Sequence, residues 1–148
     1  MTHATAHTTQ APGDLYAEVR TFYARQMRLL DGGDFAGFGR TFTEGGVFRP
    51  AGGGAPLVGP EAIAAAAGGA AARFGGGQSR HWFDMLLVDV AGDGALHTSY
   101  YAVVSVTHAD GSTVLEPSCV GKDVLVRDGG LLLNQSRDIR RDDHRATR

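Results

Sequence analysis

The chain has 148 residues, of which 43% are hydrophobic and 20% are charged, and its formal net charge is −2. Such a length is typical of one globular domain with its own hydrophobic core. The near-neutral charge gives no electrostatic preference for nucleic acid or an anionic membrane. The apolar runs are too short to cross a bilayer, the first residues do not resemble a secretory signal, and one cysteine excludes an internal disulfide. We therefore expect a cytoplasmic protein.

The first half of the chain has the pattern of helices. Residues 1–13 lack periodicity and are expected to form a disordered tail. Asp14 is expected to cap a first helix, in which apolar residues recur every three or four positions as far as Leu30. A Gly-Gly pair ends this helix. Asp34 is expected to cap a second, short helix over residues 35–43.

A short strand is expected next, over residues 47–49, because Pro50 stops it. Residues 51–59 form a glycine-rich segment without the Lys-Ser/Thr ending of a phosphate-binding loop, so a surface loop is expected. Pro60 then opens a third helix that continues to about Phe74, with proline in the first turn, where its missing N–H is tolerated.

The second half of the chain has the pattern of an antiparallel sheet. Long apolar runs alternate with tight turns that contain Asp and Gly, which are strong hairpin signals. Four strands are expected, at about residues 80–91, 95–108, 113–127 and 131–140. Three helices followed by a curled sheet predict a single α+β domain over residues 14–143, with a cone-shaped interior and a frayed tail at 144–148.

This order of elements resembles the NTF2-like superfamily, and within it the SnoaL-like and scytalone-dehydratase-like branches. The resemblance rests on four segments: residues 29–35, residues 59–63, His81 with residues 88–95, and residues 121–130 with 137–140. It implies a cone in which three N-terminal helices pack on a curved antiparallel sheet. The family includes cofactor-free dehydratases, cyclases and isomerases. It also includes subunits of ring-hydroxylating oxygenases and proteins without catalysis, so the fold alone does not define the function.

His81 is the first candidate for chemistry. In a regular strand His81, Phe83, Met85 and Leu87 share one face, which is otherwise apolar and is expected to line the interior. An imidazole there is suited to proton transfer near neutral pH. In scytalone-dehydratase-like proteins a histidine at this position belongs to the acid–base apparatus. The alternative is a core histidine held by one hydrogen bond.

Asp31 is the second candidate, because the resemblance places a pocket carboxylate here, hydrogen-bonded to the strand histidine. Such a pair would fix the tautomer of the ring and stabilise the imidazolium. The alternative is an ordinary aspartate at a helix end. Asp34 is a competing carboxylate, although its expected role is to cap the second helix.

The sequence departs from the dehydratase pattern at residues 116–120, where that family has a second histidine and this chain has none. Glu116 as an acid or base and Ser118 as a donor are candidates to replace it. Pro117 between them indicates an edge or a bulge. A two-histidine dehydration mechanism is therefore not expected, while general acid–base catalysis stays open.

Other side chains are candidate substrate contacts or have mainly structural explanations. Phe83, Tyr16 and Tyr101 are candidate substrate-binding residues, although the sequence does not show which face of its strand Tyr101 occupies. Arg137 is expected to pair with Asp138 or to bind an acidic group. The remaining expectations are an outward-facing Trp82 and a buried thiol at Cys119.

We therefore expect a small enzyme without metal or cofactor that acts on a hydrophobic, oxygenated molecule. The resemblance implies a substrate of aromatic polyketide type in natural-product biosynthesis and a dehydration, cyclisation or isomerisation. The rival hypothesis is a binding or accessory protein that supports a partner oxygenase, and a dimerisation scaffold is a weaker third. No nucleic-acid or membrane partner is expected. A homodimer or homotrimer is expected, because one face of the sheet lacks a helical cover, with Trp82 and Leu86 as contact candidates.

Overall fold

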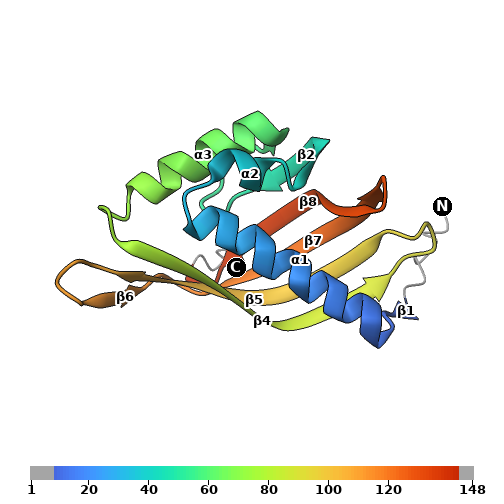
Figure 1. The fold of residues 1–148 in the computed structure, drawn as a ribbon. Coiled ribbons are helices and arrows are strands. Elements are labelled where there is room, and N and C mark those ends of the chain that lie inside the picture. The colour runs from blue at the N-terminus through green and yellow to red at the C-terminus, as the bar shows by residue number, and fades with distance from the viewer. Residues whose placement is uncertain (1–8, 144–148) are drawn as a thin grey trace, which may run out of the picture.

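The computed structural model describes residues 9–143. Three helices lie on one side of a curved, open sheet, with α1 running across the strands β4 and β5 (Figure 1). The helices are α1 (Gly13–Asp31), α2 (Phe35–Gly39) and α3 (Pro60–Ala72). The strands are β1 (Thr9–Gln10), β2 (Phe42–Arg49), β3 (Leu57–Val58), β4 (Gln78–Val90), β5 (Leu96–Thr107), β6 (Thr113–Leu115), β7 (Cys119–Asp128) and β8 (Leu131–Arg141). The predicted α+β architecture, with helices packed on a curved sheet, is present.

The 8-stranded sheet has the order β1-β4-β5-β7-β8-β2-β3, and β6 pairs with β5. The hairpins β4–β5, β5–β7 and β7–β8 form the predicted antiparallel centre. The prediction of a purely antiparallel sheet is wrong at one edge, because β2 pairs with β8 in parallel. β2 comes from the helical half of the chain, so this pairing extends the sheet beneath α3.

The first two helices differ from the prediction at their boundaries. Asp14 does not cap α1: the cap position is Pro12, and Asp14 lies in the first turn. Asp34 does cap α2, since its Oδ1 accepts a 2.8 Å hydrogen bond from the Gly37 N–H. α2 ends earlier than expected because Phe42 already pairs with Asn134 in β8, and this tertiary pairing extends β2 toward the helix.

The ends of the predicted domain and its third strand also differ. Thr9–Gln10 form β1 by pairing with β4, so these residues are ordered although a disordered tail was expected. The expectations for residues 1–8 and 144–148 lie outside the described residues. The expected third strand is divided into β6 and β7, and Pro117 lies in the gap between them. A proline cannot donate to a ladder, which explains the interruption.

A bulge in β4 changes which side chains face the interior. Asp84 pairs with Tyr101 and Leu87 pairs with Ser99, so Met85 and Leu86 together oppose one residue of β5. Met85 adopts a φ of 52°, a left-handed conformation that is uncommon outside glycine. Met85 and Leu87 are therefore 66% exposed, and the predicted face of four inward residues is wrong beyond Phe83.

The interior is packed where β5 and β7 pair beneath α1. Tyr100 is 1% exposed and lies directly over Gly121, its partner in the neighbouring strand. A Cβ atom at Gly121 would collide with the Tyr100 ring. The glycine thus gives the tyrosine room to lie flat inside the cone, where it stacks on Phe83 at 4.2 Å between ring centroids.

The convex side of β4 and β5 carries large apolar side chains. Trp82 is 58% and Tyr101 is 60% exposed, together with the bulge residue Met85 and its neighbour Leu87. Leu86, the other expected contact residue, instead packs against the core. Homo-oligomer formation stays a prediction, and Trp82 remains its candidate contact.

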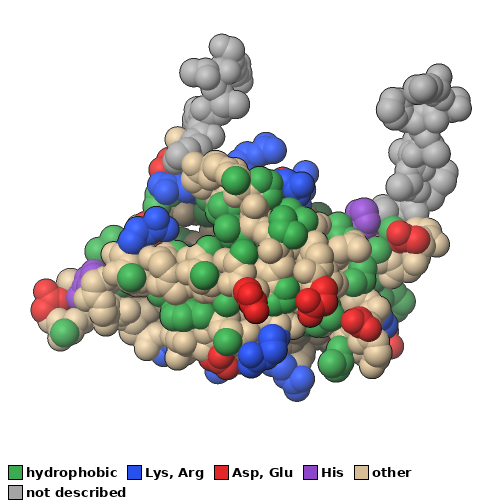
Figure 2. All heavy atoms as spheres, turned by 90° about the horizontal axis from the view of Figure 1, so that it is seen from above, with side chains coloured by type: hydrophobic (Ala, Val, Ile, Leu, Met, Phe, Trp, Pro, Cys, Tyr) green, Lys and Arg blue, Asp and Glu red, His purple; other side chains and the backbone are tan. Residues whose placement is uncertain are grey.

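The surface of the described residues carries both signs of charge, as the near-neutral net charge of the sequence predicts. Figure 2 shows acidic and basic side chains interspersed along the lower edge of the molecule rather than gathered in a field of one sign. No helix within residues 9–143 combines the length and apolar character needed to span a membrane.

Substitution of Gly121 by alanine is predicted to destabilise the protein by about 1–3 kcal/mol, because the new methyl group must displace the buried Tyr100 ring. Urea denaturation followed by circular dichroism measures this change. Gly92→Ala is the matched control, since nothing lies within 4 Å of a Cβ atom at that turn position. Equal stability of the two variants would contradict the close contact.

Self-association through the convex face predicts that Trp82→Glu lowers the molar mass in light scattering after size exclusion, because a charge would be buried at the contact. Leu131→Glu is a control at another exposed apolar residue, 70% exposed, in the β7–β8 hairpin. A wild-type protein that is monomeric at micromolar concentration would refute the prediction.

Candidate active site

Asp31 reaches the sheet because α1 ends directly above the start of β4. It is the last residue of the helix, and Gly33, with a φ of 82°, turns the chain away behind it. The side-chain amide of Gln78 donates a 3.1 Å hydrogen bond to the carbonyl oxygen of Asp31. The first residue of β4 is thus tied to the last residue of α1.

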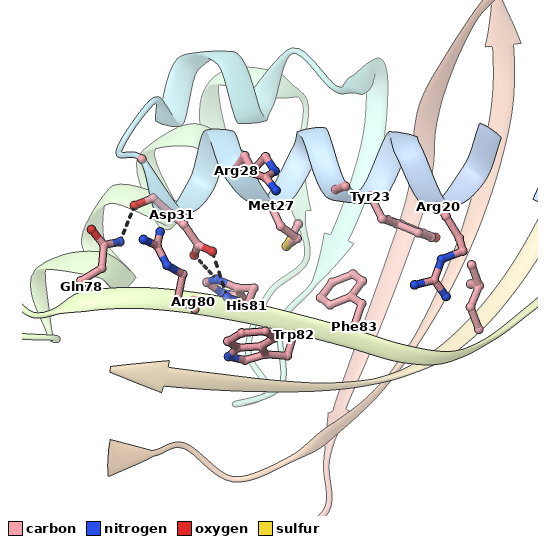
Figure 3. Close-up of a pocket in the computed structure, with 13 residues that line it drawn as sticks. Arg20, Tyr23, Met27, Arg28, Asp31, Gln78, Arg80, His81, Trp82 and Phe83 are labelled. Carbon is pink, nitrogen blue, oxygen red and sulfur yellow. Dashed lines mark hydrogen bonds and ion pairs between the residues drawn. The ribbon is translucent and has the colours of Figure 1, made fainter. Parts of the chain in front are cut away.

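Asp31 holds His81 by two hydrogen bonds (Figure 3). Its Oδ2 accepts from the His81 backbone N–H at 2.9 Å, and its Oδ1 lies 2.5 Å from His81 Nδ1. Ser79 Oγ donates a further hydrogen bond of 3.3 Å to Oδ1. Because a carboxylate can only accept, Nδ1 carries the proton and Nε2 is left as the acceptor. The ring is therefore oriented and held in one tautomer.

The side chains of this pair are shielded from solvent to different degrees. The Asp31 side chain is 7% exposed and the His81 side chain is 20% exposed. A partly desolvated carboxylate stabilises a neighbouring imidazolium more strongly than one in open water. The arrangement can therefore accept a proton at Nε2 and stabilise the resulting charge.

His81 borders an apolar cavity of about 800 Å³ inside the cone. α3 and the loop before it form the roof, and the inner faces of β5, β7 and β8 form the floor. Residues that line it include Leu30, Phe38, Phe48, Ile63, Phe74, Ala102, Val104, Cys119, Arg137 and Ile139. This volume is in the usual range for small-molecule sites, and the walls are mostly apolar.

His81 also borders a more polar cleft of about 680 Å³ between α1 and β4. Arg20 and Arg28 from α1 and Arg80 from β4 line this cleft (Figure 3). Met27, His81 and Phe83 line both hollows. The histidine thus stands where the polar cleft and the apolar cavity share a wall.

A buried polar cluster lies on the inner face beyond Phe83. Arg137 and Asp123 form an ion pair at 2.8 Å, with side chains 3% and 0% exposed. The carboxylate of Asp123 also accepts hydrogen bonds from the hydroxyls of Tyr23 (2.8 Å) and Tyr100 (3.1 Å) and from the Asn134 amide (3.1 Å). These contacts join α1, β5, β7 and β8 through one carboxylate.

The ionisation of this cluster follows from burial and from the ion pair. Burial by itself lowers the pKa of the Arg137 guanidinium, but the Asp123 carboxylate together with the neighbouring Tyr100 and Tyr23 outweighs this effect, so the pKa is raised and the charge persists. Burial raises the pKa of the Tyr23 and Tyr100 hydroxyls well above 10, and the nearby Asp123 charge raises both further. Both phenols are therefore neutral donors at physiological pH.

The comparisons with known proteins agree with this geometry. A family model for the SnoaL-like domain matches residues 14–138. The chain belongs to the SnoaL-like family of the NTF2-like superfamily. Aln2 from a Streptomyces species is 54% identical, with a TM-score of 0.89 over 91% of this chain and 96% of that one.

Two further solved structures are similar over nearly the same region. ActVI-ORFA from Streptomyces Coelicolor is 41% identical, with a TM-score of 0.81 over 87% of this chain and 98% of that one. A protein from Catenulispora Acidiphila, solved in complex with S-DNPA, is also 41% identical, with a TM-score of 0.81 over 89% and 96%. A comparison with curated proteins gave no match.

In this SnoaL-like protein the structure brings together some of the sequence-predicted site residues. His81, Asp31 and Phe83 lie in one wall, and the predicted hydrogen bond between His81 and Asp31 is present. Tyr101 lies elsewhere, because strand alternation puts Tyr100 inside and Tyr101 on the convex face. Tyr16 contacts the core near the bulge, where its hydroxyl donates to the Leu86 carbonyl at 3.2 Å, and it does not line the cavity.

Glu116 and Ser118 also lie outside the cavity. The Ser118 hydroxyl donates to Asp142 at 2.5 Å on the exposed side, and Glu116 does not line either hollow. Cys119 has the same strand phase as the buried Gly121 and Asp123, so Pro117 and Cys119 line the cavity instead. Burial raises the pKa of the half-buried Cys119 thiol, so only a small fraction is the reactive thiolate near neutral pH.

The buried cluster was missed by sequence reasoning, which expected Arg137 to pair with Asp138 or to bind an acidic group, whereas its partner is Asp123. Strand alternation could have found the correct pair. Asp123 points to the same face of β7 as the apolar Leu125, and Arg137 points to the same face of β8 as Ile139. Charged residues on an inward face require partners. No group of three or more His, Cys, Asp and Glu side chains within residues 9–143 is placed to hold a metal ion.

The raised pKa values of the buried phenols predict a loss of stability in alkali. An unfolded chain releases these protons near pH 10, while the folded chain retains them. The folded state therefore binds more protons, and the free energy of unfolding is expected to be constant below pH 10 and to fall above it. Urea denaturation between pH 8 and 11 measures the slope. Tyr100→Phe should reduce it, whereas the matched neighbour Tyr101→Phe should not.

Proposed function

We propose that this SnoaL-like protein is a cofactor-free tailoring enzyme for a hydrophobic, oxygenated molecule of aromatic polyketide type. One observation carries the proposal: a histidine oriented by a carboxylate at 2.5 Å lines an apolar cavity of about 800 Å³. Family membership supports a polyketide-type substrate. A similar protein that was solved with S-DNPA supports the presence of a ligand site in this fold.

The proposed chemistry begins with proton abstraction next to a carbonyl group. His81 Nε2 takes the proton from carbon, and the electrons of the broken C–H bond move onto the carbonyl oxygen as an enolate. Asp31 accepts a hydrogen bond from Nδ1 and stabilises the imidazolium. In a dehydration the enolate collapses, a β-hydroxyl group leaves, and the imidazolium returns its proton to that oxygen, which releases water. Isomerisation returns the proton to another carbon, and cyclisation directs the enolate to a second carbonyl.

Substitutions at the dyad test this chemistry with 2-tetralone, a bicyclic ketone with exchangeable α-protons. Wild-type protein is expected to accelerate deuterium uptake from D₂O, measured by NMR. His81→Ala should lower the protein-dependent rate by about a hundredfold or more. Asp31→Asn should lower it by up to about 10⁴-fold, because an amide can stabilise the wrong tautomer.

His97→Ala is the matched control, because His97 is an exposed histidine on the neighbouring strand β5. It should leave the exchange rate unchanged. If His81→Ala and His97→Ala exchange at the same rate, His81 is not the base. Thermal melting of each variant separates a loss of chemistry from a loss of fold.

A binding or accessory role is the second candidate function. The observation that favours it is the segment from Pro117 to Cys119, which presents no histidine to the cavity where scytalone-dehydratase-like proteins have one. A wild-type protein that binds 2-tetralone tightly without accelerating exchange would favour this role over catalysis.

A further inference from the structure

Arg137 is a buried cation that faces the cavity of the proposed site. It is 2% exposed, lies on β8, and is one of the residues that line the apolar cavity shared with His81. Charged side chains are rarely buried unless every charge and donor is paired. The pairing of its individual nitrogen atoms therefore shows what the residue does.

Two of the three guanidinium nitrogens are used by the protein. Nε donates to Asp123 Oδ1 at 3.1 Å and to Oδ2 at 3.2 Å. Nη2 donates to Asp123 Oδ2 at 2.8 Å and to Gln26 Oε1 at 2.6 Å. Both nitrogens lie on the same edge of the planar group. The structural ion pair is complete through this edge alone.

The third nitrogen, Nη1, lies on the opposite edge and donates to no acceptor within residues 9–143. Within the same residues, Asn134 Oδ1 is the one side-chain polar atom that is both fully buried and without a partner. Nη1 therefore keeps accessible surface, and the surface that Arg137 presents is the cavity wall. The site contains a pre-positioned donor with a positive charge behind it.

Aromatic rings hold the guanidinium in this orientation. Its central carbon lies 5.6 to 5.9 Å from the ring centroids of Tyr23, Phe42, Phe83 and Tyr100. Such contacts favour the charged form and leave few alternative rotamers in a packed interior. A donor held in this way needs little reorganisation when charge develops on a bound oxygen.

Phe83 relates this donor to His81. Phe83 and His81 are two positions apart on the same inward face of β4, which corresponds to roughly 7 Å along a strand. The guanidinium carbon lies 5.6 Å from the centroid of the Phe83 ring, and Arg137 lines the same cavity as His81. A flat ring system against Phe83 would thus have one end at the imidazole and an oxygen atom at Nη1.

We propose that Arg137 Nη1 donates a hydrogen bond to a substrate oxygen on which negative charge develops, so that the substrate class is a fused-ring ketone or phenol whose conjugated rings carry the charge from the carbon that His81 deprotonates to this oxygen. This assignment rests on the proposed function. Ser118, Tyr23 and Tyr100 are not available for this role, because Ser118 faces solvent and both buried tyrosine hydroxyls donate to Asp123.

Naphthol binding tests the donor without turnover. The probes are 6-cyano-2-naphthol, which ionises readily, and naphthalene, which has the same ring system without the oxygen. Affinities are measured by fluorescence. Arg137→Lys keeps a cation beside Asp123 but removes the planar fork. We expect it to weaken naphthol binding about tenfold or more and naphthalene binding less than twofold.

Further variants and a thiol readout make the result decisive. Arg140→Lys is the matched control, because Arg140 is an exposed arginine on the same strand. If Arg137→Lys does not fold, Asp123→Asn with Arg137→Gln replaces the ion pair by neutral amides and should show the same selective loss. Cys119, the only cysteine, lines the cavity, so bound naphthol must slow its reaction with a thiol reagent.

The assignment is overturned if both probes lose affinity equally, if neither loses any, or if wild-type protein binds naphthol no better than naphthalene or without protecting Cys119. Its failure is distinguishable from failure of the proposed function. If Arg137→Lys causes no selective loss of naphthol binding but deuterium exchange still depends on His81, the oxygen binds elsewhere and the proposed reaction is retained. If Arg137→Lys weakens naphthol binding selectively but the wild-type protein does not accelerate deuterium exchange, the oxygen site is retained and the proposed reaction is refuted.

Discussion

The ion pair between Arg137 and Asp123 is the interaction on which the interior of this protein depends. An isolated charge in such a place would cost several kcal/mol, so each partner requires the other. Asp123 gathers donors from α1, β5 and β8 as well, and its carboxylate therefore fixes how the first helix lies on the sheet. The position of α1 in turn decides where Asp31, its last residue, meets β4. The buried pair thereby helps to set the geometry of the dyad, which borders the same cavity.

The cavity exists because the two ends of the cone are filled differently. Beneath α1 the aromatic rings of Tyr23, Phe83 and Tyr100 pack around the guanidinium, and Gly121 leaves space for one of them. Beneath α3 the side chains are mostly alanine and glycine, which are too small to fill the space between helix and sheet. A helix of small residues thus encloses a volume rather than a packed core. The ligand site follows from the sizes of the side chains as much as from the fold.

The sheet also sets the positions of the proposed base, His81, and of the buried cation, Arg137, relative to each other. His81 and Phe83 lie before the β4 bulge and face inward together, whereas the residues at and after the bulge change phase. The bulge ends the row of inward-facing site residues at the point where Tyr100 and the charged cluster begin. A base at one position and a buried cation beyond an aromatic ring are suited to a flat molecule whose reacting carbon and oxygen are several ångströms apart.

Sequence alone determined the α+β class and the helix and hairpin order, and the family resemblance predicted the pairing of His81 with Asp31 that the structure shows. Local signals carry the first two: apolar periodicity, Asp-Gly turns and a Gly-Gly helix end depend on neighbouring residues. The dyad came from a resemblance between motifs and from the inward phase of a strand. The parallel β2–β8 pairing, the bulge at Met85, the break at Pro117 and the true partner of Arg137 were decided by tertiary structure. Each depends on residues far apart in the chain, and one shifted residue in a strand reverses which side chains are inside.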